Sequence, residues 1–245
     1  MAYVLKLILL CLFTIPYGSL MAIAGVLDWS GRTTYCMARG WCRIVLYLSG
    51  VRLRVSSEDH LDASQAYVFM ANHQSNLDIP TLIAALPRFQ LRWIAKKELL
   101  RIPFFGWGFW GCHMITINRD SLRDTRSSMK QASHKLANGL SIVVFPEGTR
   151  SPDGKLLAFK RGGFVMAQNA RAPIVPITIK GSADQLPRGA WRIEPGVVDI
   201  LIGKVISQQE AASDSRALAN QVRQIIGSDL GLNNDELVES GRISG

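Results

Sequence analysis

Hydrophobic residues along the chain occur either in short continuous runs or at helical spacing, and the two patterns alternate. The short runs predict strands at Val51–Val55, Ala66–Met70, Leu91–Ala95, His113–Ile117, Ser141–Phe145, Ile174–Ile179 and Val197–Ile202. The helical spacing predicts helices at Ile79–Leu86, Ser121–Asn138, Gly163–Ala170 and around Asp214–Ile226. Because strands and helices alternate, we expect an α/β layered domain with a largely parallel or mixed central sheet flanked by helices.

The first part of the chain has a different pattern. Leu7–Leu27 contains no charged residue and is long enough to cross a hydrocarbon layer of about 30 Å. Pro16 and Gly18 lie inside it, which allows either a kinked spanning helix or a bent pair that enters one leaflet. In Thr34–Val51, apolar residues recur at helical spacing with arginines between them. This segment predicts an amphipathic helix in the membrane interface, with a core helix of the globular domain as the alternative.

These patterns divide the chain into three parts. Residues 1–50 are predicted to form membrane-associated helices, residues 51–230 the α/β domain, and residues 231–245 a flexible tail. Arg32, Arg39 and Arg43 follow the apolar segment, whereas only Lys6 precedes it. This bias favours a cytoplasmic location for everything downstream. We therefore expect a protein of the inner (cytoplasmic) membrane whose globular domain faces the cytoplasm.

Composition also favours a membrane partner. The chain has 245 residues, 48% of them apolar, and a formal net charge of +9. A positive charge suits nucleic acid, an anionic membrane or an acidic substrate, and the apolar N-terminal segment favours the membrane. No nucleic-acid-binding module is recognisable, so we expect no nucleic-acid partner. The cysteines match neither a zinc site nor a redox pair and are expected to be reduced: Cys11, Cys36, Cys42 and Cys112.

The segment Asn72–Asp78 carries the first candidate chemistry, because it lies between a predicted strand and a predicted helix. Residues five apart on one continuous helix lie on different faces, so His73 and Asp78 meet only if the chain turns between them. The polar residues between them suit such a turn. An imidazole beside a carboxylate is a general-base pair. The alternative interpretation is a polar turn whose histidine caps a helix.

Two arginines follow other predicted strands. Arg119 comes after the strand that ends at Ile117, and Arg150 lies in Phe145–Ser151, the segment after the next strand. In open α/β sheets, ligands bind outside the carboxyl ends of the strands. A guanidinium suits a phosphate, and Gly148 allows the backbone to approach a ligand closely. We therefore expect these groups to lie near His73.

Taken together, four blocks resemble the motifs of the glycerolipid acyltransferase family, and most closely the bacterial lysophosphatidic acid acyltransferases. The blocks are Asn72–Asp78, Ile117–Arg119, Phe145–Ser151 and Ile174–Ile177. The resemblance covers about residues 50–205. It implies transfer of an acyl group from acyl-CoA or acyl carrier protein to the free 2-hydroxyl of a lysophospholipid, 1-acyl-glycerol-3-phosphate above all.

The resemblance also implies roles for individual residues. His73 would be the general base and Asp78 the residue that orients it. Residues implied in binding the acceptor's phosphate and glycerol are Arg119, Glu147, Gly148, Thr149 and Arg150, with Lys96 and Lys160 as further cations. Because a carboxylate does not itself favour a phosphate dianion, we expect Glu147 to orient an arginine or to bond a glycerol hydroxyl. The second block reads Ile-Asn-Arg, whereas relatives often have aspartate before the arginine. No metal or cofactor is expected, because a thioester carbonyl is already reactive.

The densely aromatic segment Leu99–Gly111 allows two interpretations. It is either a packed corner of the core, or a loop that faces lipid or lines a channel for an acyl chain. Oxyanion donors are expected among the N–H groups of the turn after His73 or of the helix start before Thr81.

Four alternatives to this activity stay open. Ser75 allows a covalent hydrolase, although no Gly-x-Ser-x-Gly elbow is present. The apolar segments alone would suit a non-catalytic membrane-binding protein. A metal site could use His73, Asp78 and Glu147. The acceptor could be another lysolipid or an aminolipid.

Overall fold

The computed structural model describes residues 2–28, 30–56, 58–118, 121–211, 214–233 and 235–237. In chain order its elements are α1 (Ala2–Leu27), α2 (Arg32–Ser49), β1 (Val51–Val55), β2 (Val68–Ala71), α3 (Asp78–Ala85), β3 (Leu91–Lys96), the 3₁₀ helix η1 (Lys97–Arg101), α4 (Phe105–Gly111), β4 (Ile115–Ile117), α5 (Leu122–Ala137), β5 (Ser141–Val144), α6 (Gly162–Asn169), β6 (Ile174–Lys180), α7 (Ser182–Gln185), β7 (Gly196–Ile202), α8 (Gln208–Ala211) and α9 (Ser215–Leu230). Every strand and helix predicted for the domain is present, with small differences at the ends.

Within the described residues, seven strands form one mixed sheet in the order β1-β7-β6-β2-β5-β3-β4. β2 pairs in parallel with β5 and β6, and the parallel run continues through β3 to β4. β7 is antiparallel to β6 and parallel to β1. The predicted α/β class with a largely parallel or mixed sheet is confirmed. Because β2, β5, β3 and β4 run in the same direction, their carboxyl ends lie along one edge.

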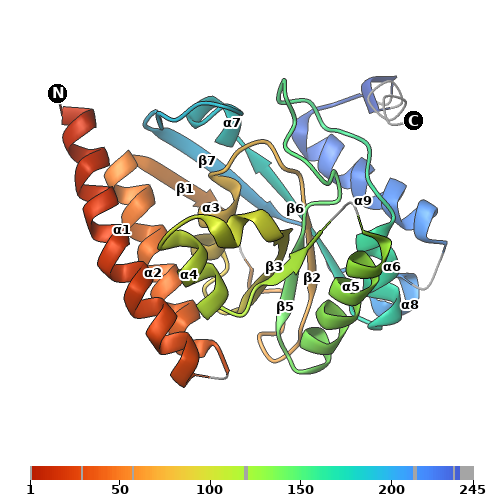
Figure 1. Ribbon diagram of the computed structural model, residues 1–245. Helices are drawn as coiled ribbons and strands as arrows, with labels where there is room; N and C mark the ends of the chain where they lie inside the picture. The colour runs from red at the N-terminus through yellow and green to blue at the C-terminus, as the bar shows by residue number, and fades with distance from the viewer. Residues whose placement is uncertain are drawn as a thin grey trace.

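Helices cover both faces of this sheet, which explains why the central strands are apolar throughout. Side chains alternate along β2, so Val68 and Met70 enter one core cluster and Phe69 and Ala71 the other. Figure 1 shows α1, α2 and α4 together on one side of the sheet and α5, α6 and α9 on the other. The two layers hold the parallel strands rigidly and leave the strand ends open for a site.

The N-terminal segment forms one helix, because α1 continues through Pro16, so it is not a bent pair. Within the part of the chain that the structure describes, no helix combines the length and the apolarity needed to cross a bilayer. α1 packs closely on α4 through glycines. A Cβ at Gly18 would lie 2.4 Å from the carbonyl oxygen of Phe104, and one at Gly25 would lie 2.4 Å from Cα of Gly111.

The apolar face of α2 packs against α3 and the core. Tyr35, Cys42 and Leu46 are buried in the same cluster as Phe69 and Leu82. This packing supports the core-helix alternative for the segment predicted at residues 34–51. The division of the chain at residue 50 stays a prediction.

Two local features depart from the expected pattern. The aromatic segment forms η1 and α4; Gly108 and Gly111 of α4 face α1, while Trp107 and Trp110 are about half exposed. β4 starts at Ile115, two residues later than predicted, because His113 has a left-handed backbone conformation with φ of 51°. In the predicted flexible tail, Leu237 is buried against Gly227, so this part of the tail is packed.

Candidate active site

The turn between β2 and α3 carries His73 and Asp78. Asn72, the first residue after β2, is fully buried and pairs with the backbone of Ile179 in β6. Its Nδ2 donates to the carbonyl oxygen over 2.9 Å, and its Oδ1 accepts from the amide over 2.8 Å. This pairing fixes where the chain leaves the sheet. The following residue, His73, therefore starts from a defined position at the carboxyl edge.

Asp78, the first residue of α3, accepts the hydrogen bonds that hold the turn. Its Oδ2 lies 2.8 Å from His73 Nδ1 and also accepts the backbone N–H groups of Gln74, at 2.8 Å, and Ser75, at 2.9 Å. The side chain is fully buried, and Oδ1 has no hydrogen-bond partner among the described residues. The predicted pairing of His73 with Asp78 across a turn is therefore present, and three donors hold the carboxylate oxygen that the imidazole uses.

The His73 ring is held from a second direction. It stacks on the ring of Phe145, with centroids 3.9 Å apart and an interplanar angle of 11°. Its side chain is 16% exposed. Because Nδ1 bonds Asp78, the tautomer with a proton on Nδ1 leaves Nε2 with a lone pair on the other side of the ring. The imidazole is therefore oriented to accept a proton at Nε2.

Glu147 lies beside His73 but points both carboxyl oxygens at backbone. Oε1 accepts the N–H of His73 over 2.6 Å, and Oε2 accepts the N–H of Leu157 over 2.9 Å. Burial raises the pKa of Glu147 to about 8, whereas the two amide donors lower it. The role implied by the resemblance, contact with the acceptor, stays a prediction. These bonds show that Glu147 joins the ends of β2 and β5.

The expected phosphate-binding groups follow the strand ends. Gly148 has φ of 74°, and Lys160 lies against it, with Nζ 3.2 Å from the position a Cβ would take. Thr149 is exposed and Arg150 partly exposed in the same turn. Lys96 is exposed at the end of β3. The structure brings Lys160 together with Gly148.

The remaining predicted cation is Arg119, which lies outside the described residues. β4 ends at Ile117, so the chain leaves the sheet two residues before it. Whether its guanidinium faces His73 stays a prediction.

Ser75 is not presented as a nucleophile. It is fully buried, and its Oγ donates to the carbonyl oxygen of Leu186 over 2.7 Å. The amides of Gln74 and Ser75 already donate to Asp78, so these two expected oxyanion donors are occupied. The other expected donors, in the rest of the turn and at the helix start before Thr81, stay a prediction.

A metal site at these residues has little support from the geometry. Among the described residues, no group of three His, Cys, Asp or Glu side chains is arranged to hold a metal ion. Both oxygens of Glu147 are bonded to amides, so they do not point at a shared point with His73 and Asp78. The expectation that no metal or cofactor is needed stays a prediction.

An apolar cavity of about 460 Å³ adjoins the turn. It is enclosed by α1, α2, α3, α4 and the loop after α7, and its lining includes Tyr17, Trp41, Ile83, Phe105 and Ile193. Asn76, Leu77 and Ile79, from the turn itself, also line it. The cavity therefore begins next to the residues that hold the imidazole.

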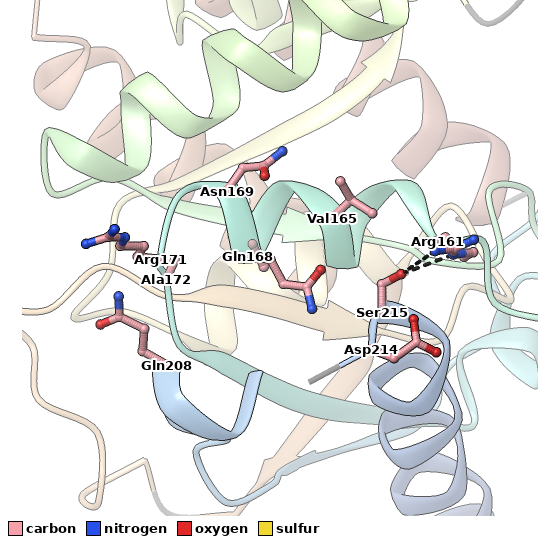
Figure 2. A pocket seen from close by; sticks show the side chains of 10 residues that line it. Arg161, Val165, Gln168, Asn169, Arg171, Ala172, Gln208, Asp214 and Ser215 are labelled. Atoms are coloured by element: carbon pink, nitrogen blue, oxygen red, sulfur yellow. Dashed lines mark hydrogen bonds between the residues drawn. The ribbon is translucent and has the colours of Figure 1, made fainter. Parts of the chain in front are cut away.

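A second cavity, of about 650 Å³, lies between α6 and the start of α9 and has both polar and apolar lining residues (Figure 2). Figure 2 shows Arg161, which donates to Ser215, on one side of this cavity. Arg171 lies on the other side, and amide side chains lie between the two arginines. None of the predicted site residues lines it. The larger cavity is therefore separate from the His73 turn.

Comparison with known proteins identifies the family of the chain. A family model described as Acyltransferase matches residues 52–180. The 1-acyl-sn-glycerol-3-phosphate acyltransferase of Pseudomonas aeruginosa is 30% identical over 224 residues, which is 89% of this chain and 85% of the relative. The chain belongs to the acyltransferase family. The resemblance read from the four sequence blocks is thereby confirmed at the level of the family.

Two further acyltransferases are similar to the chain. Human 1-acyl-sn-glycerol-3-phosphate acyltransferase alpha is 35% identical over 181 residues, 73% of this chain. The match spans 64% of the human protein, slightly less than two thirds of its length. The crystal structure of the 1-acyl-sn-glycerophosphate (LPA) acyltransferase PlsC from Thermotoga maritima superposes with a TM-score of 0.78 at 25% identity, covering 94% of this chain and 97% of that one.

Sequence reasoning missed three supporting residues of this acyltransferase site. Asn72 and Phe145 lie inside the recognised blocks, but their pairing with β6 and stacking on His73 appear only in the fold. Gln74 donates through Nε2 to the carbonyl oxygen of Gly154 over 2.6 Å. The signal for Asn72 in the sequence was a polar residue directly after a buried apolar strand, where a buried polar side chain needs hydrogen-bond partners.

Proposed function

We propose that the chain transfers a fatty acyl group from an acyl thioester to the free 2-hydroxyl of 1-acyl-glycerol-3-phosphate, giving phosphatidic acid. The observation that carries this proposal is the position of the His73–Asp78 pair beside an apolar cavity that the same turn lines. Acyl transfer needs a general base next to a space for an acyl chain. The names of the relatives support the same reaction.

In this mechanism His73 Nε2 removes the proton of the 2-hydroxyl as the oxygen attacks the thioester carbonyl. Asp78 stabilises the imidazolium that forms. The tetrahedral intermediate then collapses and breaks the carbon–sulfur bond, and the departing thiolate takes the proton from His73. Base catalysis of this kind contributes roughly 10²- to 10⁴-fold.

The acceptor's phosphate would be held by the cations at the carboxyl edge. Arg150 and Lys160 follow β5, and Lys96 ends β3. Arg119 is proposed as the fourth cation, with the backbone of Gly148 and Thr149 approaching the phosphate or the glycerol. Fixing the phosphate positions the 2-hydroxyl at His73, and such orientation contributes several kcal/mol.

The apolar cavity suits the acyl chain of a substrate. Each buried methylene group contributes about 0.8 kcal/mol, so a long chain binds mainly through its length. The donor is acyl-CoA or acyl carrier protein, and neither a metal nor another cofactor is part of the proposed reaction.

We also propose that α1 and α4 contact membrane lipid. Exposed apolar side chains cover the outer surface of α1: Leu12, Ile15, Leu20, Ile23, Val26 and Leu27. On α4, Trp107 and Trp110 are 46% and 50% exposed. Apolar surface of this extent suits a lipid partner, and Trp favours the interface. Because α1 also lines the cavity, a lipid chain would reach the site from the bilayer. The inner membrane and its cytoplasmic side are the proposed location.

An acceptor panel tests the proposed function. Purified protein is given an acyl thioester and one of three acceptors: 1-acyl-glycerol-3-phosphate, a lysolipid with a larger headgroup, or a monoacylglycerol without phosphate. We expect transfer to the first at the highest kcat/KM, and we expect Arg150→Ala to remove most of that preference. A preference for another lysolipid or an aminolipid would replace the acceptor. Lipid binding without turnover of any donor would favour a non-catalytic membrane protein.

The hydrolase alternative is tested separately. Ser75→Ala should retain substantial acyl transfer, because Ser75 Oγ bonds Leu186 and does not contact His73 in the structure. Loss of transfer in a folded Ser75→Ala protein, with His73→Ala active, would favour the hydrolase. Activity that survives a chelator would dismiss the metal alternative.

A further inference from the structure

The Glu147 carboxyl group is placed to hold backbone. It is 2% exposed, and each of its oxygens accepts one backbone amide. Each oxygen keeps a lone pair for its amide donor whether the group is ionised or protonated. A substrate hydroxyl or phosphate would have to compete with these buried bonds, whose loss would leave the amides of His73 and Leu157 unsatisfied.

The bond from His73 N to Glu147 is one of two that fix the histidine backbone. The carbonyl oxygen of His73 accepts the N–H of Ser151 over 2.9 Å. Glu147 and Ser151 both belong to the segment that follows β5. The main chain of His73 is therefore bound on both sides by the neighbouring strand's loop, while Asp78 and Phe145 fix its side chain.

The second bond of Glu147 leads toward α9. We call the series of hydrogen bonds from His73 through Glu147 and Leu157 to Arg223 the support. Leu157 donates its N–H to Glu147, and its carbonyl oxygen accepts Nε of Arg223 over 3.2 Å. Arg223 also donates from a terminal nitrogen to the carbonyl oxygen of Leu237 over 2.7 Å. α9 itself packs on β6 and α6, so this end of the support is anchored in the layer of helices seen at the right of Figure 1.

Charge is consistent with this connection. Burial raises the pKa of Glu147, and the guanidinium of Arg223 lowers it. Glu147 in turn raises the pKa of Arg223, against the lowering by burial. The two side chains thus stabilise each other's charged forms across the Leu157 backbone.

We propose that Glu147 is a positioning residue for His73, and that Arg223 positions the segment around Leu157 from which Glu147 receives its second bond. The inference rests on the proposed function, because it takes His73 as the base. Glu147 then does not touch the acceptor. Arg223 lies outside residues 52–180, the part matched by the family model, so the support joins the acyltransferase region to the C-terminal helix.

The substitution Glu147→Gln separates positioning from substrate contact. The glutamine has nearly the same shape, but its nitrogen has no lone pair, so one of the two amides loses its acceptor. Displacement of a catalytic group by about 1 Å can cost 10²-fold in rate. We expect kcat to fall between about 10- and 100-fold, while KM for the acceptor changes less than about twofold.

The assay uses the full-length chain in mixed micelles, with 1-oleoyl-glycerol-3-phosphate and palmitoyl-CoA or palmitoyl acyl carrier protein, whichever wild type uses. Arg150→Ala is the contrast, because it should raise KM for the acceptor. A Glu147→Gln variant with raised KM and unchanged kcat would show that Glu147 touches the acceptor. Unchanged kcat and KM would also overturn the inference.

A second variant covers the case in which Glu147→Gln does not fold. Arg223→Gln, at the outer end of the support, should lower kcat about 3- to 10-fold with KM unchanged. Arg216→Gln replaces an exposed arginine on the same helix and is the matched control, with no expected effect. Equal kcat for Arg223→Gln and Arg216→Gln would overturn the role of Arg223. Absence of transfer by the wild-type chain is a different result, because it would contradict the proposed function itself.

Discussion

Asp78→Asn separates the charge of Asp78 from its geometry. In the structure, Oδ2 alone accepts from His73, Gln74 and Ser75, and Oδ1 is buried without a partner among the described residues. An asparagine can place its amide oxygen at the Oδ2 position and keep all three bonds. The His73 tautomer is then retained, and what is lost is the negative charge beside the imidazolium.

The size of the loss follows from two limits. A hydrogen bond to a charged group contributes about 1 kcal/mol more than a neutral one, which sets the lower limit near fivefold in rate. Unit charges about 4 Å apart interact by roughly 4 kcal/mol at an effective dielectric constant of 20, which sets the upper limit near 1,000-fold. We therefore expect kcat to fall between about 5- and 1,000-fold.

The same substitution should lower stability. The new amide nitrogen occupies the buried Oδ1 position, and an unsatisfied buried donor costs about 1–3 kcal/mol. Asp78→Ala should be worse, because it leaves the Gln74 and Ser75 amides without their acceptor.

Steady-state acyl transfer and urea unfolding measure both effects. The control is Asp184→Asn, which changes an exposed aspartate at the start of α7 and should alter neither quantity. Wild-type kcat in folded Asp78→Asn would refute the reasoning, because the charge would then have no part in the reaction.

Three further predictions follow from burial and packing. Burial raises the pKa of Glu147 to about 8, above about 4.3 in an unfolded chain, so its contribution to the unfolding free energy is full below about pH 4 and is lost as the pH rises to about 8. The unfolding free energy should therefore decline more steeply from pH 5 to 8 in wild type than in Glu147→Gln. Equal slopes for the two proteins would contradict this. Burial raises the pKa of the Cys42 thiol to about 12 and that of Cys112 to about 11, so both are expected to react slowly. Treatment with iodoacetamide at pH 8 followed by peptide mapping should find the exposed Cys36 modified and the two buried cysteines intact. Rapid modification of either buried cysteine would show that the core around it opens. Gly25→Val should destabilise the protein by about 1–3 kcal/mol, because the new Cβ would meet the backbone of Gly111. Gly162→Ala is the control and should have little effect, because its Cβ would meet open space. Equal melting temperatures for the two variants would refute the close packing of α1 on α4.

The sheet was predictable because each central strand is a continuous apolar run between polar turns. β2, β5 and β6 are buried on both faces, and this burial leaves a clear signal in the sequence. The strand order and the antiparallel pairing of β7 with β6 depend on long-range contacts that local patterns do not contain.

Helix α4 shows why the aromatic segment was ambiguous. Gly108 and Gly111 contact α1, more than eighty residues earlier in the chain, so no local pattern reveals why glycine stands at these two positions. Of its aromatic residues, Phe105 and Phe109 line the cavity, and Trp107 and Trp110 are about half exposed. The glycine packing on α1 fits the interpretation as a packed corner, and the role in binding lipid or an acyl chain stays a prediction.

For the candidate site, the sequence indicated the turn that joins His73 to Asp78 but not the contacts of the neighbouring residues. The spacing of His73 and Asp78 required a turn, and the turn is present. Glu147 was expected to orient an arginine or to bond a glycerol hydroxyl, and nothing in the sequence indicated that its oxygens bond the backbone of His73 and Leu157. A sequence shows which groups follow a strand, but it does not show which of them face inward.

The most direct test of the central claim is the acyl-transfer rate of His73→Ala on 1-acyl-glycerol-3-phosphate, measured beside Ser75→Ala. We expect a loss of about 10²- to 10⁴-fold in kcat for His73→Ala, with the protein folded and the acceptor KM close to wild type. Transfer at the wild-type rate by His73→Ala would contradict it.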